Sequence, residues 1–174
     1  MKNDINIYWV EGECEMIFIK SSPFLGKAEK VDLCEIPLNK LRSRTIKLPA
    51  NKKKLLLYII FDTDVLKNFP AKLDNFLQNL KYLENNGYQL RLLQQDIDFE
   101  DEIMKCNNIS SSKFRELFDI RNQKEFKTKM LREHQMHKKI IEKIPNLKLW
   151  ESELFYKLST HINKQSSYKK LPTS

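Results

Sequence analysis

Glycine is scarce in this chain, with only three among 174 residues. The Gly-rich loops that cradle phosphates in P-loop and dinucleotide-binding proteins need several closely spaced glycines, so neither loop is present. Cysteine is also rare: Cys14, Cys34 and Cys106 are widely spaced and form no CxxC pair. This pattern argues against a disulfide framework and against a zinc knuckle, and it fits a reducing cytoplasm.

Long hydrophobic runs are missing as well. The strongest run, Leu55 to Phe61, has seven residues, whereas a helix that spans a bilayer needs roughly 20. Residues 1–4 lead into a strand-like segment and do not resemble the start of a signal peptide. We therefore expect a soluble, cytoplasmic protein with no membrane partner.

Positive charge is concentrated in the last third of the chain. The net charge is +8, and residues 1–122 hold 19 basic and 18 acidic side chains, whereas residues 123–174 hold 12 basic and 5 acidic ones. We interpret residues 1–122 as an α/β domain and residues 123–174 as a basic helical extension packed on it, with frayed last residues. A basic face of this kind fits a polyanion such as nucleic acid, or merely keeps the chain soluble.

Apolar runs alternate with stripes at helical spacing along the chain, and these patterns predict strands and helices respectively. The predicted strands are 5–10, 30–36, 55–61 and 88–94. The predicted helices are 13–21, 69–83, 99–106, 112–118, 123–132 and 134–143, with a further helical turn around 38–42. A strand, a helix and a strand in succession form a βαβ unit, so we expect a parallel sheet flanked by helices.

Acidic residues follow three of the predicted strands. Residues 11–15 contain three acids, Asp62 and Asp64 end the central apolar run, and residues 96–102 contain five acids in seven positions. Ligands of open α/β sheets bind outside the carboxyl ends of the strands, so the sheet would bring the three clusters to one edge. Mg²⁺ or Mn²⁺ would neutralise them there, because both prefer hard oxygen ligands.

Two of the clusters also have a structural explanation when they are taken alone, and the first, at Glu11-Gly12, is a weak signal by itself. The acids of residues 98–102 would lie in the first turn of a helix, where the helix dipole favours negative charge. Asp62 and Asp64 are typical turn residues. The metal interpretation therefore depends on the three clusters meeting at the same end of the sheet.

The first two clusters resemble motifs of the Toprim family. Residues 7–12, followed by Glu15, look like its first motif, a hydrophobic strand that ends in Glu-Gly. Residues 56–64 look like its second motif, a hydrophobic strand that ends in Asp-x-Asp. The third cluster is similar to a late acidic segment of the OLD and RloB-like branch, where a Phe-Glu pair, here Phe99-Glu100, follows a strand.

The resemblance covers roughly residues 5–105 and suggests a small stand-alone member of that branch. It implies a Toprim-like Rossmannoid parallel sheet and a nuclease that cleaves DNA or RNA with Mg²⁺ or Mn²⁺, in bacterial defence or a mobile element. The implied catalytic residues are Glu11, Asp62, Asp64 and Glu100. The implied metal ligands are Glu11, Glu15, Asp62, Asp64, Glu100 and Glu102.

Lysines of the basic extension are the candidates for nucleic-acid binding, which would make affinity depend strongly on salt. They are Lys127, Lys129, Lys138, Lys139, Lys169 and Lys170, of which either Lys127 or Lys129 would neutralise the scissile phosphate. A homodimer is compatible with the sequence. The alternative function is a Toprim-like module without cleavage activity that binds nucleic acid or serves as an adapter for a partner ATPase.

Overall fold

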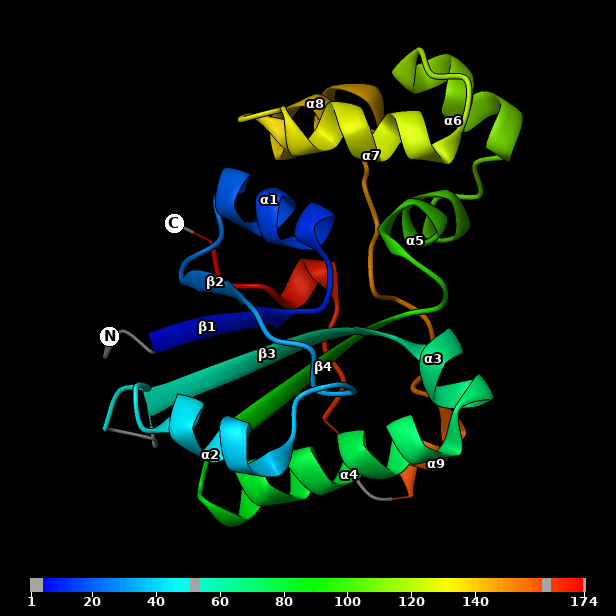
Figure 1. The fold of residues 1–174 in the computed structure, drawn as a ribbon. Helices are drawn as coiled ribbons and strands as arrows, with labels where there is room; N and C mark the ends of the chain where they lie inside the picture. The colour runs from blue at the N-terminus through cyan, green and yellow to red at the C-terminus, as the bar shows by residue number, and fades with distance from the viewer. Residues whose placement is uncertain (1–4, 51–53, 161–163, 174) are drawn as a thin grey trace.

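The computed structural model describes residues 5–50, 54–160 and 164–173. Within these ranges a parallel sheet of four strands forms the centre, in the order β2-β1-β3-β4 (Figure 1). The strands are β1 (Ile5–Val10), β2 (Lys27–Lys30), β3 (Leu55–Asp62) and β4 (Gln89–Gln95). The expected α/β class, with a parallel sheet flanked by helices, is confirmed.

Helices cover both faces of the sheet (Figure 1). On one side lie α1 (Glu13–Ser21), α5 (Phe99–Cys106), α6 (Ser111–Phe118), α7 (Gln123–Leu131) and α8 (Met136–Lys143). On the other side lie α2 (Leu38–Thr45), α3 (Thr63–Asn68), α4 (Pro70–Asn85) and α9 (Tyr156–Ser159). None of the helices in the described ranges has both the length and the apolar character needed to cross a bilayer.

Side chains at alternate positions of the central strands pack into two separate hydrophobic cores, one on each face of the sheet. Tyr58 and Ile60 of β3 belong to the core that contains Phe18 of α1. Leu57 of β3 belongs to the opposite core, together with Phe76 of α4. Both faces of the strand are therefore buried, which is why its sequence is a continuous apolar run.

The predicted strand 30–36 is wrong. Strand β2 ends at Lys30, and the chain then turns at Asp32, whose Oδ1 accepts the N–H groups of Cys34 at 2.7 Å and Glu35 at 3.1 Å. The carbonyl of Asp32 also accepts the N–H of Ile36 at 2.9 Å. An aspartate that bonds the backbone ahead of it forms a turn, and here this local preference outweighs the weak apolar alternation.

The other predicted strands and helices are present, with ends displaced by no more than three residues. Helix α2 continues three residues beyond the predicted turn at 38–42. Two short helices, α3 and α9, were not predicted, because segments of six and four residues carry no clear periodicity.

Residues 164–173 do not fray as expected. The N–H of Leu92 donates to the carbonyl of Lys164 at 2.8 Å, and the N–H of Ser166 donates to the carbonyl of Leu92 at 2.8 Å. The segment therefore covers the outer edge of β4. Farther on, the residues Tyr168–Lys170 form a 3₁₀ turn, and Pro172 accepts a hydrogen bond from the N–H of Leu25 at 2.9 Å. Backbone pairing of this kind leaves no mark in a polar, Lys-rich sequence.

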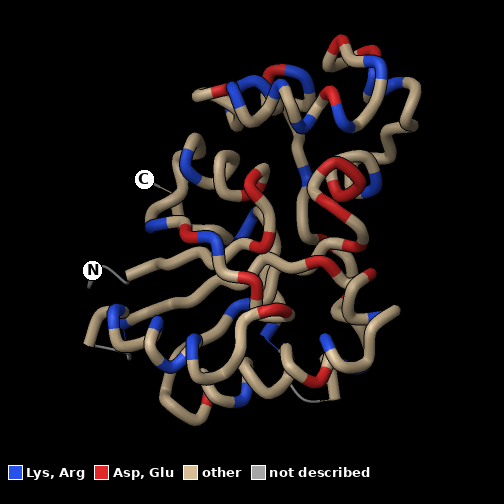
Figure 2. The backbone as a smooth tube through the Cα atoms, viewed as in Figure 1, with Lys and Arg blue, Asp and Glu red and all other residues tan. Residues whose placement is uncertain are grey.

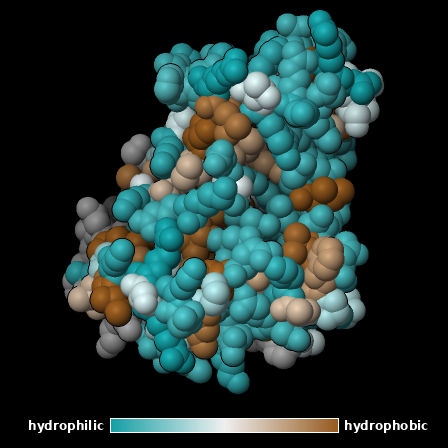
Figure 3. All heavy atoms as spheres, viewed as in Figure 1, coloured by the Kyte–Doolittle hydropathy of each residue, from teal (hydrophilic) through white to brown (hydrophobic). Residues whose placement is uncertain are grey.

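Exposed hydrophobic side chains come from separate segments of the chain. They are Ile5, Leu25, Ile46, Phe69, Ile97, Leu131 and Tyr156. On the face seen in Figure 3, hydrophobic patches are separated by hydrophilic surface. The homodimer stays a prediction.

The course of the chain creates a switch point at the carboxyl edge of the sheet. From β1 the chain passes to α1 on one face, and from the neighbouring β3 it passes to α3 and α4 on the other face. In open α/β sheets, ligands bind in the crevice at such a point. Figure 2 shows Asp and Glu gathered at this edge.

Candidate functional site

Strand register brings distant acids side by side at the switch point. Val10 of β1 is aligned with Ile60 of β3, and Asp62 of β3 is aligned with Gln95 of β4. Glu11, the residue after β1, therefore reaches the end of β3, where its Oε2 accepts the N–H of Asp62 at 3.2 Å. The sheet thus joins the first two acidic clusters, as the carboxyl-edge argument requires.

Gln95 holds two carboxylates together. Its Nε2 donates to Oε1 of Glu15 at 2.5 Å and to Oδ1 of Asp62 at 2.6 Å. Its own Oε1 accepts the indole N–H of Trp150 at 3.4 Å. One amide therefore ties the first turn of α1 to the ends of β3 and β4, and the C-terminal extension fixes the orientation of that amide.

Gly12 makes room for Glu15 over the start of α1. A Cβ placed on Gly12 would lie 2.1 Å from Oε2 and 2.9 Å from Cδ of Glu15. Glu15 is only 4% exposed and is held by Gln95, so its carboxylate has little freedom to move away. Gly12 is therefore a packing requirement of this acidic site.

A pocket of about 260 Å³ opens beside Glu15 and Asp62, and Glu100 and Lys127 also line it. Glu100 is completely buried, and neither of its carboxylate oxygens has a hydrogen-bond partner among the described residues. The ammonium of Lys127 lies 3.8 Å from Oε2 of Glu100 and 3.4 Å from Oδ2 of Asp98. The pocket therefore holds more carboxyl groups than its one lysine can pair with.

Burial and mutual repulsion raise the pKa of the acids at this edge. Burial raises the pKa of Asp62 to about 8, and the charge of Glu11 adds to the shift. Burial raises the pKa of Glu11 to about 7, with Asp32 adding to it, and the pKa of Glu100 to about 8, with Asp98 adding to it. A cation bound nearby would return these groups to their ionised form.

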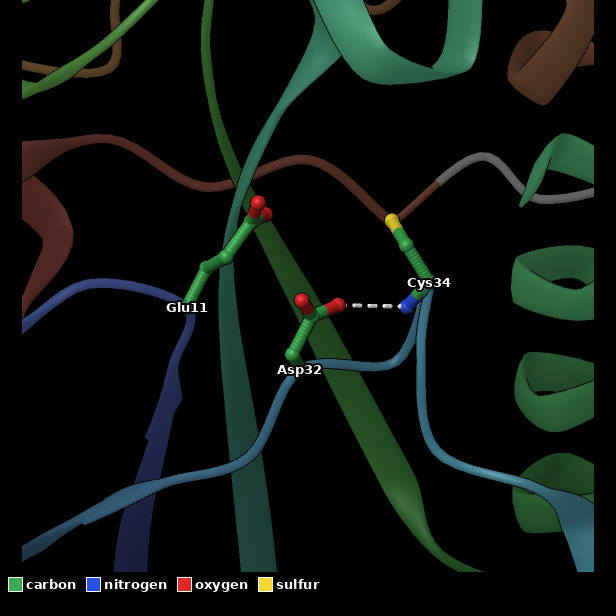
Figure 4. A group of neighbouring side chains, drawn as sticks. All are labelled: Glu11, Asp32 and Cys34. Atoms are coloured by element: carbon green, nitrogen blue, oxygen red, sulfur yellow. Dashed lines mark hydrogen bonds between the residues drawn. The ribbon is translucent and has the colours of Figure 1, made fainter. Parts of the chain in front are cut away.

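A second group of donors lies on the β2 side of Glu11. One carboxylate oxygen of Glu11, one of Asp32 and the Sγ atom of Cys34 all lie within 4.8 Å of one another (Figure 4). In the parts of the chain that the structure describes, no other three His, Cys, Asp or Glu residues place their ligand atoms so close together. Glu11, Asp62 and Asp64 therefore do not form such a compact set.

Two of the acids expected at the site have other partners. Oδ1 of Asp64 accepts the N–H of Val65 at 2.6 Å, and Asp64 is not among the residues that line the pocket. Oε1 of Glu102 accepts the N–H of Trp150 at 2.5 Å and the thiol of Cys106 at 3.0 Å. Glu102 therefore anchors the extension.

The sequence patterns did not identify three residues of the site, namely Gln95, Asp32 and Cys34. Gln95 directly precedes the third acidic cluster, so its place at the end of a strand was the available signal. Asp32 and Cys34 fell inside the predicted strand 30–36, which hid the fact that they follow the end of β2.

Four of the six candidate lysines are paired with acids of the same chain. The pairs are Lys127 with Asp98 and Glu100, Lys129 with Asp119, Lys139 with Glu133, and Lys169 with Glu151. The described part of the chain shows no ion pair for Lys138 or Lys170. Figure 2 shows basic residues spread along α7 and α8, and among the six candidates Lys127 alone lines the acidic pocket.

Comparison of the chain with models of known families, with curated proteins and with solved structures finds no match. The class of protein is defined by the fold and the site alone: it is an α/β protein with a parallel sheet and an acidic switch point. The Toprim resemblance stays a hypothesis that rests on the sequence motifs.

Proposed function

We propose that the chain is a divalent-metal-dependent nuclease of the Toprim type, which hydrolyses phosphodiester bonds in DNA or RNA in bacterial defence or a mobile element. The observation that carries the proposal is the meeting of one buried and two half-buried acids at the switch point between β1 and β3. There Glu11 bonds the backbone of Asp62, and Gln95 holds Asp62 against Glu15.

The donors around the pocket fit a hard cation. Glu15, Asp62 and Glu100 offer carboxylate oxygens, the ligands that Mg²⁺ and Mn²⁺ prefer. Glu100 gives the strongest support: its buried carboxyl group has no hydrogen bond among the described residues and its one cationic neighbour there, Lys127, is 3.8 Å away, so a bound cation would stabilise its ionised form. A cation bound there would lower the pKa of a water molecule and stabilise the charge that develops on a phosphodiester.

The chain's own residues would orient such a substrate. Lys127 stands at the pocket with its side chain 47% exposed, so its ammonium can contact both Glu100 and a phosphate. Gln95 fixes the orientation of Asp62, and Glu11 holds the end of β3 through the Asp62 N–H. Asp64 would join through its second oxygen, because its first accepts the N–H of Val65.

One observation favours the alternative, a module that binds nucleic acid or a partner ATPase without cleaving. The three motif acids Glu11, Asp62 and Asp64 do not bring their ligand atoms within 4.8 Å of one another in the described chain. A protein that had lost cleavage would keep the fold and the basic helices while its motif acids drifted apart.

Manganese calorimetry and cleavage assays distinguish the two functions. We expect the wild-type protein to bind Mn²⁺ and to cut at least one of plasmid DNA, tRNA and single-stranded DNA. Asp62→Asn and Glu100→Gln should each lose both properties, whereas Glu116→Gln, at an exposed acid of α6, should keep them. Binding without cleavage would support the adapter. Absence of Mn²⁺ uptake would contradict the metal-dependent nuclease.

A further inference from the structure

Glu11, Asp32 and Cys34 form a donor cluster that the acidic pocket does not use. The acids follow the ends of two neighbouring strands, β1 and β2, and the cysteine lies in the next turn. Figure 4 shows the three side chains side by side at this edge of the sheet. Their ligand atoms already lie within 4.8 Å of one another, which is close to the spacing of ligands around a single ion.

The thiol of Cys34 is buried close to the two carboxylates. Cys34 is only 2% exposed, and in the described chain its sulfur makes no hydrogen bond. Its backbone N–H is already committed to Oδ1 of Asp32 at 2.7 Å. Cys34 packs in the apolar core under α4, as a structural cysteine usually does, but two carboxylate oxygens also lie within 4.8 Å of its sulfur. The two nearby carboxylates disfavour a thiolate at Cys34 by repulsion, and they favour a thiolate that is bound to a cation.

The turn that carries Asp32 and Cys34 is held rigidly by α4. Nδ2 of Asn79 donates to the carbonyls of Leu33 at 3.0 Å and Ile36 at 2.9 Å, and Nδ2 of Asn75 donates to the carbonyl of Cys34 at 2.9 Å. A ligand that binds here would not have to order the loop first. Preorganised donors of this kind strengthen binding.

Within residues 5–50, 54–160 and 164–173, no cationic side chain pairs with the acids of this cluster. No ion pair in the described ranges involves Glu11 or Asp32, in contrast to the pocket acids Asp98 and Glu100, which face Lys127. The negative charge of this cluster is therefore left for a ligand to neutralise.

We propose that Glu11, Asp32 and Cys34 bind one thiophilic divalent cation of the Zn²⁺ class, with water in the remaining position. One sulfur and two carboxylate oxygens suit a borderline-soft ion, whereas Mg²⁺ selects oxygen alone. Binding replaces the thiol proton of Cys34 with the metal, and that proton passes to solvent. The site overlaps the residues of the nuclease proposal at Glu11, whereas Asp32 and Cys34 belong to this site alone.

Cadmium titration tests the site, because a Cd²⁺–thiolate bond produces an ultraviolet charge-transfer band. We expect the full-length protein to take up one Cd²⁺ per chain with this band. Cys34→Ser should abolish the band, whereas the matched variants Cys14→Ser and Cys106→Ser should keep it. A band that survives in Cys34→Ser, or that is lost in one of the other two variants, would overturn the proposal.

Two further measurements do not depend on the folding of Cys34→Ser. Asp32→Asn keeps the thiol and an oxygen for the turn, and it should weaken Cd²⁺ binding about tenfold or more. In a crystal of wild-type protein soaked in Cd²⁺, the anomalous signal should lie within bonding distance of Cys34 Sγ, and its absence there would refute the site. Asp62→Asn separates the two proposals: it should keep the Cd²⁺ band and lose Mn²⁺-dependent cleavage.

Discussion

Carboxylic acids lie on both sides of the switch point, but the groups that surround them differ. On the α1 and α5 side, an amide bridges Glu15 to Asp62, and Lys127 stands near Glu100. On the β2 side, Glu11 and Asp32 face a thiol. One side thus carries part of its own neutralisation, whereas on the other side no ion pair with Glu11 or Asp32 is present in the described ranges.

The difference follows from the alternation of side chains along a strand. Asp62 is in phase with Tyr58 and Ile60, which face the core under α1. Glu11 is in phase with Ile7 and Trp9, which belong to the core under α4. Two acids that meet through a backbone hydrogen bond therefore send their carboxylates into different surroundings. Neighbouring acids at one sheet edge can in this way serve two different ligands.

The largest effect should come from removing the amide bridge. Gln95→Leu leaves the buried Glu15 carboxylate, the half-buried Asp62 carboxylate and the Trp150 indole without their shared partner, which should lower the free energy of unfolding by about 2–4 kcal/mol. Urea unfolding measures the change. Gln78→Leu, at an exposed position of α4, should cost less than about 0.5 kcal/mol. Equal costs for the two variants would show that the bridge is not a stabilising feature.

The next largest effect is a dependence of folding stability on pH, which the acids of the pocket should cause. The folded-state pKa values of Asp62 and Glu100 are raised to about 8, above the values of an unfolded chain, so the folded protein holds these protons more tightly. Without metal, stability should therefore fall as the pH rises from about 5 to about 8, by ~1–3 kcal/mol. Thermal unfolding across this range measures the slope.

Asp96 should not contribute to the change in stability between pH 5 and 8, because its pKa is shifted in the opposite direction. Lys105 and Lys67 hold the pKa of Asp96 well below its usual range, so its contribution to stability is lost only as the pH falls below about 4. Between pH 5 and 8 the raised acids should cause the fall in stability, partly offset below about pH 6.5 by His137, whose pKa burial lowers, and Glu100→Gln should flatten the fall. An unchanged slope in that variant would remove Glu100 from the explanation.

A smaller effect should come from Gly12→Ala, compared with Gly87→Ala. The new methyl group at position 12 meets the Glu15 carboxylate, whereas position 87 has open space and only a strained φ of +81°. Each variant should cost about 1 kcal/mol of stability. Calorimetry should show about tenfold weaker Mn²⁺ binding for Gly12→Ala alone. Weakened binding in both variants would mean that the effect does not pass through Glu15.

The smallest effect concerns single lysines of the basic helices. Lys138 has no ion pair in the described chain, so it is free to contact a phosphate, whereas Lys139 is paired with Glu133. Lys138→Ala should reduce the slope of log affinity against log salt by about 0.7–0.9, the value for one phosphate contact. Lys139→Ala should change the slope less. Fluorescence anisotropy with labelled DNA or RNA at several salt concentrations measures both.

Much of the fold could be predicted because its determinants are local. The strand Leu55–Asp62 is apolar throughout, since helices cover both of its faces, and helix Phe99–Cys106 begins where the side chain of Asp98 accepts the N–H of Asp101 at 2.9 Å. The failures were of another kind. The strand 30–36 and the fraying of residues 164–173 were misjudged because a single turn-forming aspartate and backbone pairing to β4 decided them.

The candidate site likewise has features that the sequence predicts and features that depend on the tertiary structure. The sequence by itself determined that acids follow three strands of a parallel sheet, because those positions depend on where each apolar run ends. Only the tertiary structure decided the partners, since strand register and side-chain alternation join residues far apart in the chain. It placed Gln95 between Glu15 and Asp62, turned Glu102 toward Trp150, and set Cys34 beside Glu11.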